Sequence, residues 1–291
     1  MIPHGAAART YYNLSPPATH ATGDVWKGLP SLSLCGNSSV CSGLVVTPAC
    51  DLANHKTPSI TYLPILGVRE YLATHAGYSL ARKALIQLLD DRLKINGASS
   101  LLPRTSIPNS DTIGLIESEA HSITAPSLKD AVIRTLAGLA ALRSINASSL
   151  DAAIHLRQCL KAKDWRDLIN RIATNSESDD IHFVPGEQPS GPWSAVVGPS
   201  VTLFRYPITV PRALLDLAND ETDEWRTQSE SISNASFRVV ERPLKVLRLQ
   251  KEFLSDLLTR FARLYVRIGS PDFTRDAVDS FYQEIDADCT P

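Results

Sequence analysis

The chain has 291 residues, of which 43% are hydrophobic and 21% are charged, and its formal net charge is −2. These values are ordinary for a globular protein with enough apolar residues to form a core. They exclude a global bias toward nucleic acid or an anionic membrane, so any such binding would depend on a local patch.

The five cysteines are scattered and odd in number, which argues against a disulfide framework and for a reducing compartment. The N-terminal sequence lacks the basic-then-apolar layout of a secretory signal. No apolar run approaches the ~20 residues that a membrane span requires. We therefore expect a cytoplasmic protein that does not cross a membrane.

The first third of the chain predicts strands. Residues 1–22 carry little pattern and are expected to form an irregular arm. Short β-prone runs follow at residues 23–26, around Val45 and at residues 60–63, with turn residues between them. Three short strands before any helix favour a small barrel or a strongly bent sheet.

The middle of the chain predicts helices. Apolar residues recur at helical spacing from Val68 to Leu93, with Gly77 as a predicted break. A Pro- and Ser-rich passage then predicts a short extended pair around Leu101 and Ile113. Further helical patterns bring the mostly helical block to residue 175.

Strands return after this block. Short β-prone runs lie at residues 182–185, 194–197 and 201–204. The longest helical pattern then runs from Pro243 to Ile268, and a shorter amphipathic segment follows between Phe273 and Ile285.

Strands, then helices, then strands is the order expected when a helical block interrupts one β-module. We therefore predict an α+β fold with a small SH3-like β-barrel, a large helical insertion and C-terminal helices. Its parts would be residues 1–66, the N-terminal arm and first strands; 67–175, the insertion; 176–218, the strands that complete the barrel; and 219–291, a polar loop and the C-terminal helices.

The loop between the second and third predicted strands carries the densest set of chemically able side chains. A hydrolase centred on Cys50 would need His55 or another histidine as its base, because the adjacent Asp51 carboxylate opposes thiolate formation. The alternative is a buried cysteine at a strand end, with Asp51 capping the turn through backbone amides. Asn54 and Lys56 on the same loop are candidate binding residues.

Other site signatures are absent from the sequence. Cys35, Cys41, Cys50 and His55 have the spacing C-x5-C-x8-C-x4-H, which misses the paired knuckle of zinc sites. The sequence also has no phosphate-binding loop, no dinucleotide fingerprint and no nucleophile elbow. No metal and no cofactor are therefore expected.

A basic row is the second candidate surface. Arg260, Arg263 and Arg267 share one face of the helix predicted over residues 243–268. Such a row could grip phosphates or an acidic partner. The alternative is a solvated face opposite the Leu/Phe stripe.

Two resemblances add to this picture. The segment from Gly23 to Ile65, with GDVW and then LVVTPACDLANHKTPSITYLPI, resembles the opening of the MazF/PemK toxin family of compact SH3-like barrels that cleave RNA. The resemblance implies a barrel that includes this segment, and ribonuclease activity. Where the family has a basic Arg-Pro pair, this chain has residues 41–43, Cys-Ser-Gly.

Over most of its length the chain also resembles an uncharacterised bacterial family that we associate with defence or mobile-element neighbourhoods. The shared pieces are a G-D-[IV]-[WF] start, an L-V-[VL]-[ST]-x-x-C-D-L segment, a later F-x-P and V-V region, and a terminal R-[IV]-G-x-P. They lie here at residues 23–26, 44–52, 183–197 and 267–271. This resemblance implies no particular reaction.

The sequence thus favours a bacterial binding or adaptor module that acts through contacts with a protein partner or with nucleic acid, as part of a defence system. The alternative is an enzyme, either a toxin-like ribonuclease or a cysteine-dependent hydrolase centred on Cys50 and Asp51.

Overall fold

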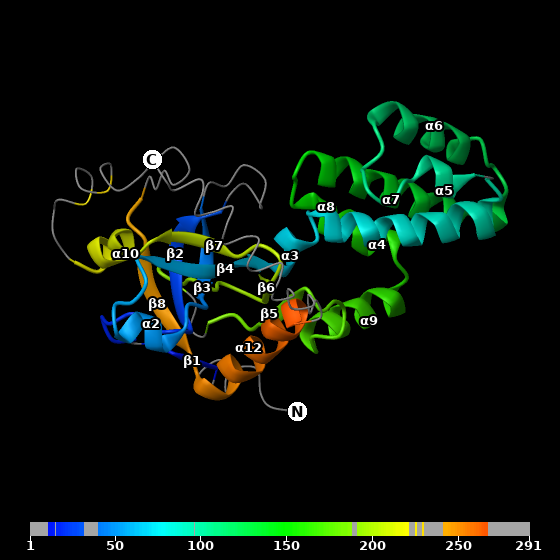
Figure 1. The fold of residues 1–291 in the computed structure, drawn as a ribbon. Coiled ribbons are helices and arrows are strands. Elements are labelled where there is room, and N and C mark those ends of the chain that lie inside the picture. Colours follow the sequence, from blue (N-terminus) through cyan, green and yellow to red (C-terminus); the bar gives the residue numbers. More distant parts are fainter. Residues whose placement is uncertain are drawn as a thin grey trace, which may run out of the picture.

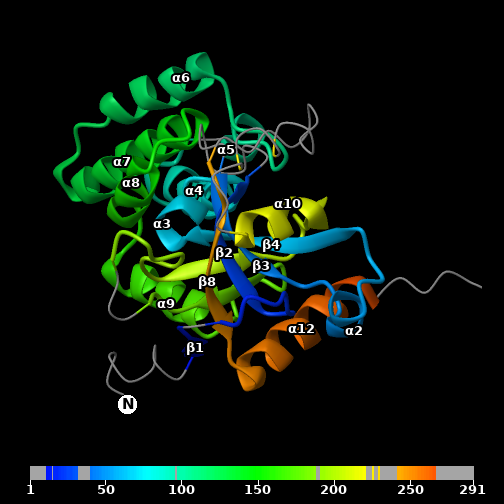
Figure 2. The ribbon, with the colours of Figure 1, turned by 90° about the vertical axis from the view of Figure 1, so that its left-hand side faces the viewer.

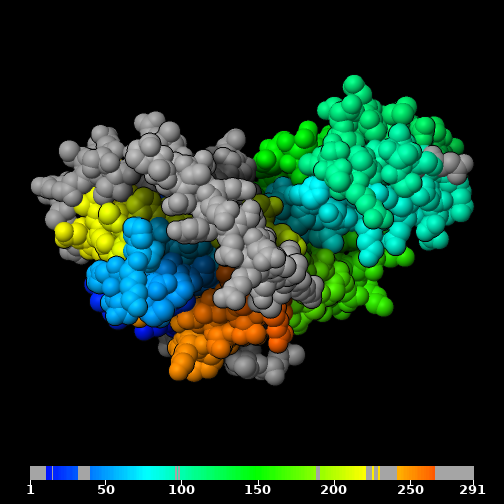
Figure 3. All heavy atoms as spheres, in the orientation of Figure 1, coloured from blue at the N-terminus to red at the C-terminus, as the bar shows by residue number. Residues whose placement is uncertain are grey.

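The computed structural model describes residues 11–14, 16–31, 40–95, 97–187, 191–220, 225, 229 and 241–266. These residues form a mixed α+β structure, in which a group of helices lies beside an antiparallel sheet (Figure 1). In the space-filling view the same helices, in cyan and green, form a lobe beside the sheet region (Figure 3). The predicted α+β class is therefore confirmed.

The eight described strands form one sheet in the order β1-β8-β2-β3-β4-β6-β5, and β7 also pairs with β4. β4 is the central strand, since it pairs with β3 along one edge and with β7 and then β6 along the other. The bounds are β1 (Tyr12–Asn13), β2 (Asp24–Pro30), β3 (Val40–Val45), β4 (Ser59–Gly67), β5 (Ile181–Val184), β6 (Ser200–Leu203), β7 (Ile208–Pro211) and β8 (Leu244–Leu249).

Most of the helices lie between β4 and β5 in the sequence. None of the described helices is both long and apolar enough to cross a membrane. The bounds are α2 (Ala49–Ala53), α3 (Val68–Tyr71), α4 (His75–Ile86), the π-helix η1 (Gln87–Leu93), α5 (Ala98–Leu101), α6 (Ser110–His121), the 3-10 helix η2 (Pro126–Leu128), α7 (Lys129–Asn146), α8 (Asp151–Cys159), α9 (Ala162–Ala173), α10 (Arg212–Asn219) and α12 (Lys251–Val266).

Both faces of the sheet are covered by helices. Alternate strand residues point to opposite faces, so Val25 packs on the α12 side and Trp26 on the α10 side. Figure 2 shows α10 and α12 with the strands between them. Leu66 and Leu203 of the sheet belong to a third cluster of buried hydrophobic residues. Most residues of this cluster lie on helices α3 to α9.

The sheet is open, and the predicted closed SH3-like barrel is not shown. The strands at the two ends of the order, β1 and β5, have no backbone ladder between them. Side chains join these ends instead. The hydroxyl of Tyr12 donates to the carbonyl of Pro185 at 2.6 Å, and the hydroxyl of Tyr11 lies 3.2 Å from Nε2 of His182.

The helix predicted over residues 243–268 is wrong in its first part. Residues 244–249 form β8, which pairs with β1 and β2, and a helix begins only at Lys251. The apolar residues Leu244 and Leu247 fit a helical period, but Leu247 and Leu249 are the buried pair, two residues apart as in a strand. The expected helix end at Gly269 and the segment from Phe273 lie outside the described residues.

Three smaller predictions are also wrong. The break before α4 falls at Leu72–Thr74, where the Thr74 side chain accepts a hydrogen bond from the amide of Ala76, and Gly77 lies inside the helix. The expected extended pair around residues 101 and 113 belongs to α5 and α6. Residues 194–197 are irregular, although Ala195 and Val196 are buried.

Gly77 is required by a close approach of two backbone segments. A Cβ atom at this position would lie 1.8 Å from the carbonyl oxygen of Leu72. Gly114 in α6 is the opposite case, since a Cβ atom there would meet nothing within 4 Å. The two helical glycines therefore form a matched pair.

We expect Gly77→Ala to lower the free energy of unfolding by about 1–3 kcal/mol, because the backbone must move to admit the methyl group. Gly114→Ala should raise it by about 0.5–1 kcal/mol, because alanine is the better helix former. Urea denaturation of both variants and the wild type measures the difference. Equal effects of the two substitutions would contradict the close approach at Leu72.

His182 is a buried histidine of β5. Its imidazole lies between Tyr11 and Phe204, with Nδ1 3.9 Å from a carboxylate oxygen of Asp256. Burial lowers the pKa of His182 to about 4, opposed by Asp256 and assisted by Arg260. The folded protein therefore holds this imidazole neutral at pH values where an unfolded chain protonates it.

Since the unfolded state binds the proton from about pH 6.5 downward, the free energy of unfolding should fall by up to about 3 kcal/mol between pH 6.5 and pH 4. Chemical denaturation across this range should show a shallower pH dependence for His182→Gln. His121→Gln, on the exposed surface of α6, is the control and should keep the wild-type slope. If the free energy of unfolding of His182→Gln depended on pH as steeply as that of the wild type, His182 would not be the group responsible.

Candidate functional site

The predicted site loop contains a short helix. Residues 49–53 form α2, and the side chain of Asn54 closes it by donating to the carbonyl of Cys50 at 2.7 Å. His55 follows in the left-handed region with φ of 50°, and the amide of Lys56 donates to the carbonyl of Asp51. Asn54 therefore has a structural role, while the side chains of His55 and Lys56 are exposed.

Cys50 fits neither interpretation of the sequence. Its side chain is exposed, so the prediction of a buried cysteine at a strand end is wrong. No side chain caps the N-terminus of α2, where Pro48 is the N-cap residue, so the expected capping role of Asp51 is wrong as well. The Cys50 thiol lies 3.6 Å from a carboxylate oxygen of Asp51, and no described histidine forms a hydrogen bond with it. Within the described part of the chain, Cys50 therefore has no neighbouring histidine that could serve as the base of a catalytic thiol.

A groove of about 420 Å³ lies between α2, α10 and the segment before β2. We call it the α2–α10 groove. It brings His55 of the predicted loop together with residues from two distant parts of the chain, 18–20 and 212–220. Its lining consists of Ala18, Thr19, His20, Leu52, Ala53, His55, Arg212, Asp216, Asn219 and Asp220.

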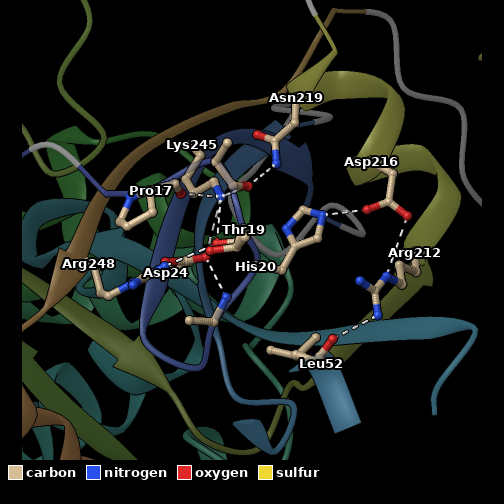
Figure 4. Close-up of polar contacts among 12 residues, drawn as sticks. Pro17, Thr19, His20, Asp24, Leu52, Arg212, Asp216, Asn219, Lys245 and Arg248 are labelled. Atoms are coloured by element: carbon tan, nitrogen blue, oxygen red, sulfur yellow. Dashed lines mark hydrogen bonds and ion pairs between the residues drawn. The ribbon is translucent and has the colours of Figure 1, made fainter. Parts of the chain in front are cut away.

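The base of the groove is held by one shared carboxylate (Figure 4). Asp216 accepts a hydrogen bond from Nε2 of His20 at 2.9 Å, and its other oxygen lies 3.4 Å from Nε of Arg212. Arg212 also donates to the carbonyl of Leu52 at 3.1 Å, which links α10 to α2. The side chains of His20 and Arg212 are both largely buried, so this arrangement is fixed by packing as well as by charge.

His20 and Asp216 have the composition of an acid–base dyad. Burial lowers the pKa of His20, Lys245 lowers it further, and the Asp216 carboxylate opposes both effects. The imidazole is therefore a neutral hydrogen-bond donor to Asp216 at neutral pH. Its other nitrogen, Nδ1, is buried and has no hydrogen-bond partner among the described residues. Because Nδ1 is closed to the groove, this geometry positions the ring and offers no route for proton transfer to a ligand.

A buried ion cluster positions the segment that carries His20. Asp24 is completely buried, and its carboxylate accepts from Nε of Arg248 at 2.6 Å and lies 3.7 Å from Nζ of Lys245. Lys245 also donates to the carbonyls of residues 17, 18 and 19. A register shift in the β2–β8 ladder lets both cations of β8 reach the same carboxylate.

Trp26 is the apolar centre of this arrangement. Its ring centroid lies 5.6 Å from the His20 ring and 5.6 Å from Nζ of Lys245. Burial lowers the pKa of Lys245, and the Asp24 carboxylate opposes this effect. The aspartate and tryptophan of the GDVW motif therefore support the segment beside the groove.

Two members of the predicted basic row on α12, Arg260 and Arg263, line the same small pocket, and Arg260 also has backbone partners. Arg260 turns inward and donates to the carbonyls of Asn175 and Ile181, at 2.9 and 3.4 Å. Arg263 is exposed and lines a small pocket together with Arg260 and Asp179, and Arg267 lies outside the described residues. Arg260 therefore fastens α12 to the sheet and also borders the pocket of Arg263.

No family model, no curated protein and no solved structure matches the chain. Within the described part of the chain, no group of three or more His, Cys, Asp or Glu side chains could hold a metal ion. The site is therefore interpreted from its own geometry.

The most informative residues of the groove were missed by the sequence analysis. His20 and Asp216 are 196 residues apart, and neither belongs to a recognisable motif. The alternation in LKVLRL was the available signal for β8, and a strand there would have placed Lys245 and Arg248 near the GDVW motif.

We expect Asp24→Asn to lower the free energy of unfolding by about 3–5 kcal/mol, because two partly buried cations lose their counter-ion. Asp151→Asn is a matched control, since Asp151 is 62% exposed and 3.6 Å from Arg69, and it should cost less than about 1 kcal/mol. Guanidinium denaturation measures both. A small loss in Asp24→Asn would show that the cluster does not hold β2 to β8.

Proposed function

We propose that the chain is a binding module that recognises a protein partner through the α2–α10 groove. The observation that carries this proposal is the contrast between the base of the groove and its edge. The base holds the largely buried side chains of His20 and Arg212, which a hydrogen bond and an ion pair join to Asp216, whereas Asp216, His55 and Asp220 are exposed. A rigid base with exposed edge groups suits recognition without turnover.

The charge at the edge favours a basic segment of the partner. Asp216 is 51% exposed although it contacts His20 and Arg212, and Asp220 is exposed beside it. A Lys or Arg side chain would enter the groove with its charge directed toward these carboxylates.

A nucleic-acid ligand has less support. Carboxylates at the groove repel phosphates, and Arg260 of the basic row already donates to two backbone carbonyls. The enzyme alternative centred on Cys50 also lacks support, since no described base lies against the thiol. The proposal therefore keeps the binding-module hypothesis and its protein partner.

The relation to an SH3-like barrel and the bacterial defence role are supported by observations other than the groove. The relation to an SH3-like barrel is supported by the tyrosine hydrogen bonds between β1 and the end of β5. These contacts bring the outer strands of the open sheet together. The arrangement is similar to a barrel in which side chains replace the backbone hydrogen bonds between the first and last strands. The bacterial defence role rests on the motif resemblance alone.

To test the proposal, peptides that bind the wild-type protein are selected from a displayed peptide library. The library includes Lys and Arg among the residues at its variable positions. Affinity is measured with a fluorophore on Cys50, which is exposed on α2, after Cys35, Cys41 and Cys289 are replaced by Ser. We expect Ala53→Arg, which puts bulk and positive charge in the groove, to weaken the selected basic peptides by about tenfold or more.

The matched control is Ala173→Arg on the exposed face of α9, which should leave the affinity unchanged. Selection of peptides without basic residues, or equal binding by both variants, would overturn the proposal. Groove-dependent binding of a labelled single-stranded RNA in place of peptides would favour the nucleic-acid alternative.

A further inference from the structure

A second cavity lies at the junction between the helical lobe and the sheet. It has a volume of about 370 Å³, within the range of small-molecule sites. We call it the junction cleft. It opens between the start of α4, the segment before β5 and the end of β6, and it lies apart from the α2–α10 groove, with which it shares no lining residue.

The inner part of the junction cleft is apolar. Ile181 and Leu203 of the sheet are buried at its base, and the aliphatic side chain of Leu80 adds a wall from α4. The ring of Tyr71, which is only 7% exposed, completes this surface. The cleft therefore suits a ligand with a compact apolar body.

Tyr71 also brings a polar group to the cleft. No hydrogen bond joins its hydroxyl to any described residue, and the hydroxyl is not among the fully buried polar atoms, so it is accessible to a ligand. Burial, together with the nearby carboxylates of Glu177 and Asp180, raises the pKa of Tyr71 to about 12. The hydroxyl thus stays protonated and faces two negative charges.

Each of these carboxylates has an oxygen to spare. Glu177 accepts from Nε of Arg171 through Oε2 at 2.6 Å, and Asp180 accepts from Nε of Arg205 through Oδ1 at 2.8 Å. Their other oxygens have no hydrogen bond in the described structure. Arg171 and Arg205 are 47% and 61% exposed, so water screens their charges more than those of the carboxylates.

We propose that the junction cleft binds a primary amine carried on a small aromatic or aliphatic body. An ammonium group has three donors, and Oε1 of Glu177, Oδ2 of Asp180 and the hydroxyl oxygen of Tyr71 are three acceptors. The ring of Tyr71 adds a favourable surface for a cation. The apolar base then holds the body of the ligand.

The test measures phenethylamine binding to the full chain by ligand-observed NMR and calorimetry. We expect saturable binding in the millimolar range or tighter, and binding of the neutral isostere 2-phenylethanol about tenfold weaker. Tryptamine, a larger amine, tests the same site with more apolar contact. Equal binding of amine and alcohol, or no saturable binding of either amine, would overturn the proposal.

Variants locate the site. Glu177→Gln and Asp180→Asn should each weaken phenethylamine by about fivefold to tenfold, and Tyr71→Phe by about threefold, while leaving 2-phenylethanol nearly unchanged. Glu117→Gln is the matched control, because Glu117 also pairs with an arginine, Arg143, but lies on α6 outside the cleft. Loss of amine binding in the control alone, or undiminished binding in all three cleft variants, would place the amine elsewhere. Peptide binding at the α2–α10 groove is an independent readout and should not change.

Discussion

The ion cluster around Asp24 is the interaction on which most of this structure depends. Asp24 and Arg248 are 224 residues apart, and their contact fastens β8 to β2 after the long helical excursion of the chain. Lys245 in the same cluster binds the carbonyls before β2 and so fixes His20 at the base of the α2–α10 groove. A completely buried carboxylate is tolerated here because two cations and the amide of Ala21 satisfy it.

The edge strand β5 shows how the sheet ends without closing. An open edge exposes unpaired backbone groups that favour aggregation. Here the amide of Phe183 donates to the side chain of Asn175, and its carbonyl accepts from Tyr11. Arg260 from α12 binds the carbonyl of Ile181. The arginine that the sequence pattern assigned to phosphate binding thus also holds an edge strand.

The sequence predicted what depends on local pattern. The α+β class, the central helical block and the strands around Val45 and Ile60 follow from periods of 2 and 3.6 residues in the chain. The strand β8 was missed because leucines three residues apart fit a helix, and only pairing with β1 and β2 selects the extended form. The groove was beyond the sequence for a similar reason: His20, Arg212 and Asp216 meet through tertiary packing, and none belongs to a local motif. Of the predicted loop, only His55 lines the groove.

Central strand β4 connects the two proposed sites. Before it, α2 forms one wall of the α2–α10 groove through Leu52, which is 2% exposed and whose carbonyl binds Arg212. After it, α3 begins directly at Val68 and carries Tyr71 into the junction cleft. In the Cys-Asp-Leu segment, the cysteine and the aspartate are therefore the more exposed residues. The leucine makes the contact that shapes the α2–α10 groove. A rigid strand with a site at each end fixes the distance between two ligands, which is the property that an adaptor requires of its scaffold.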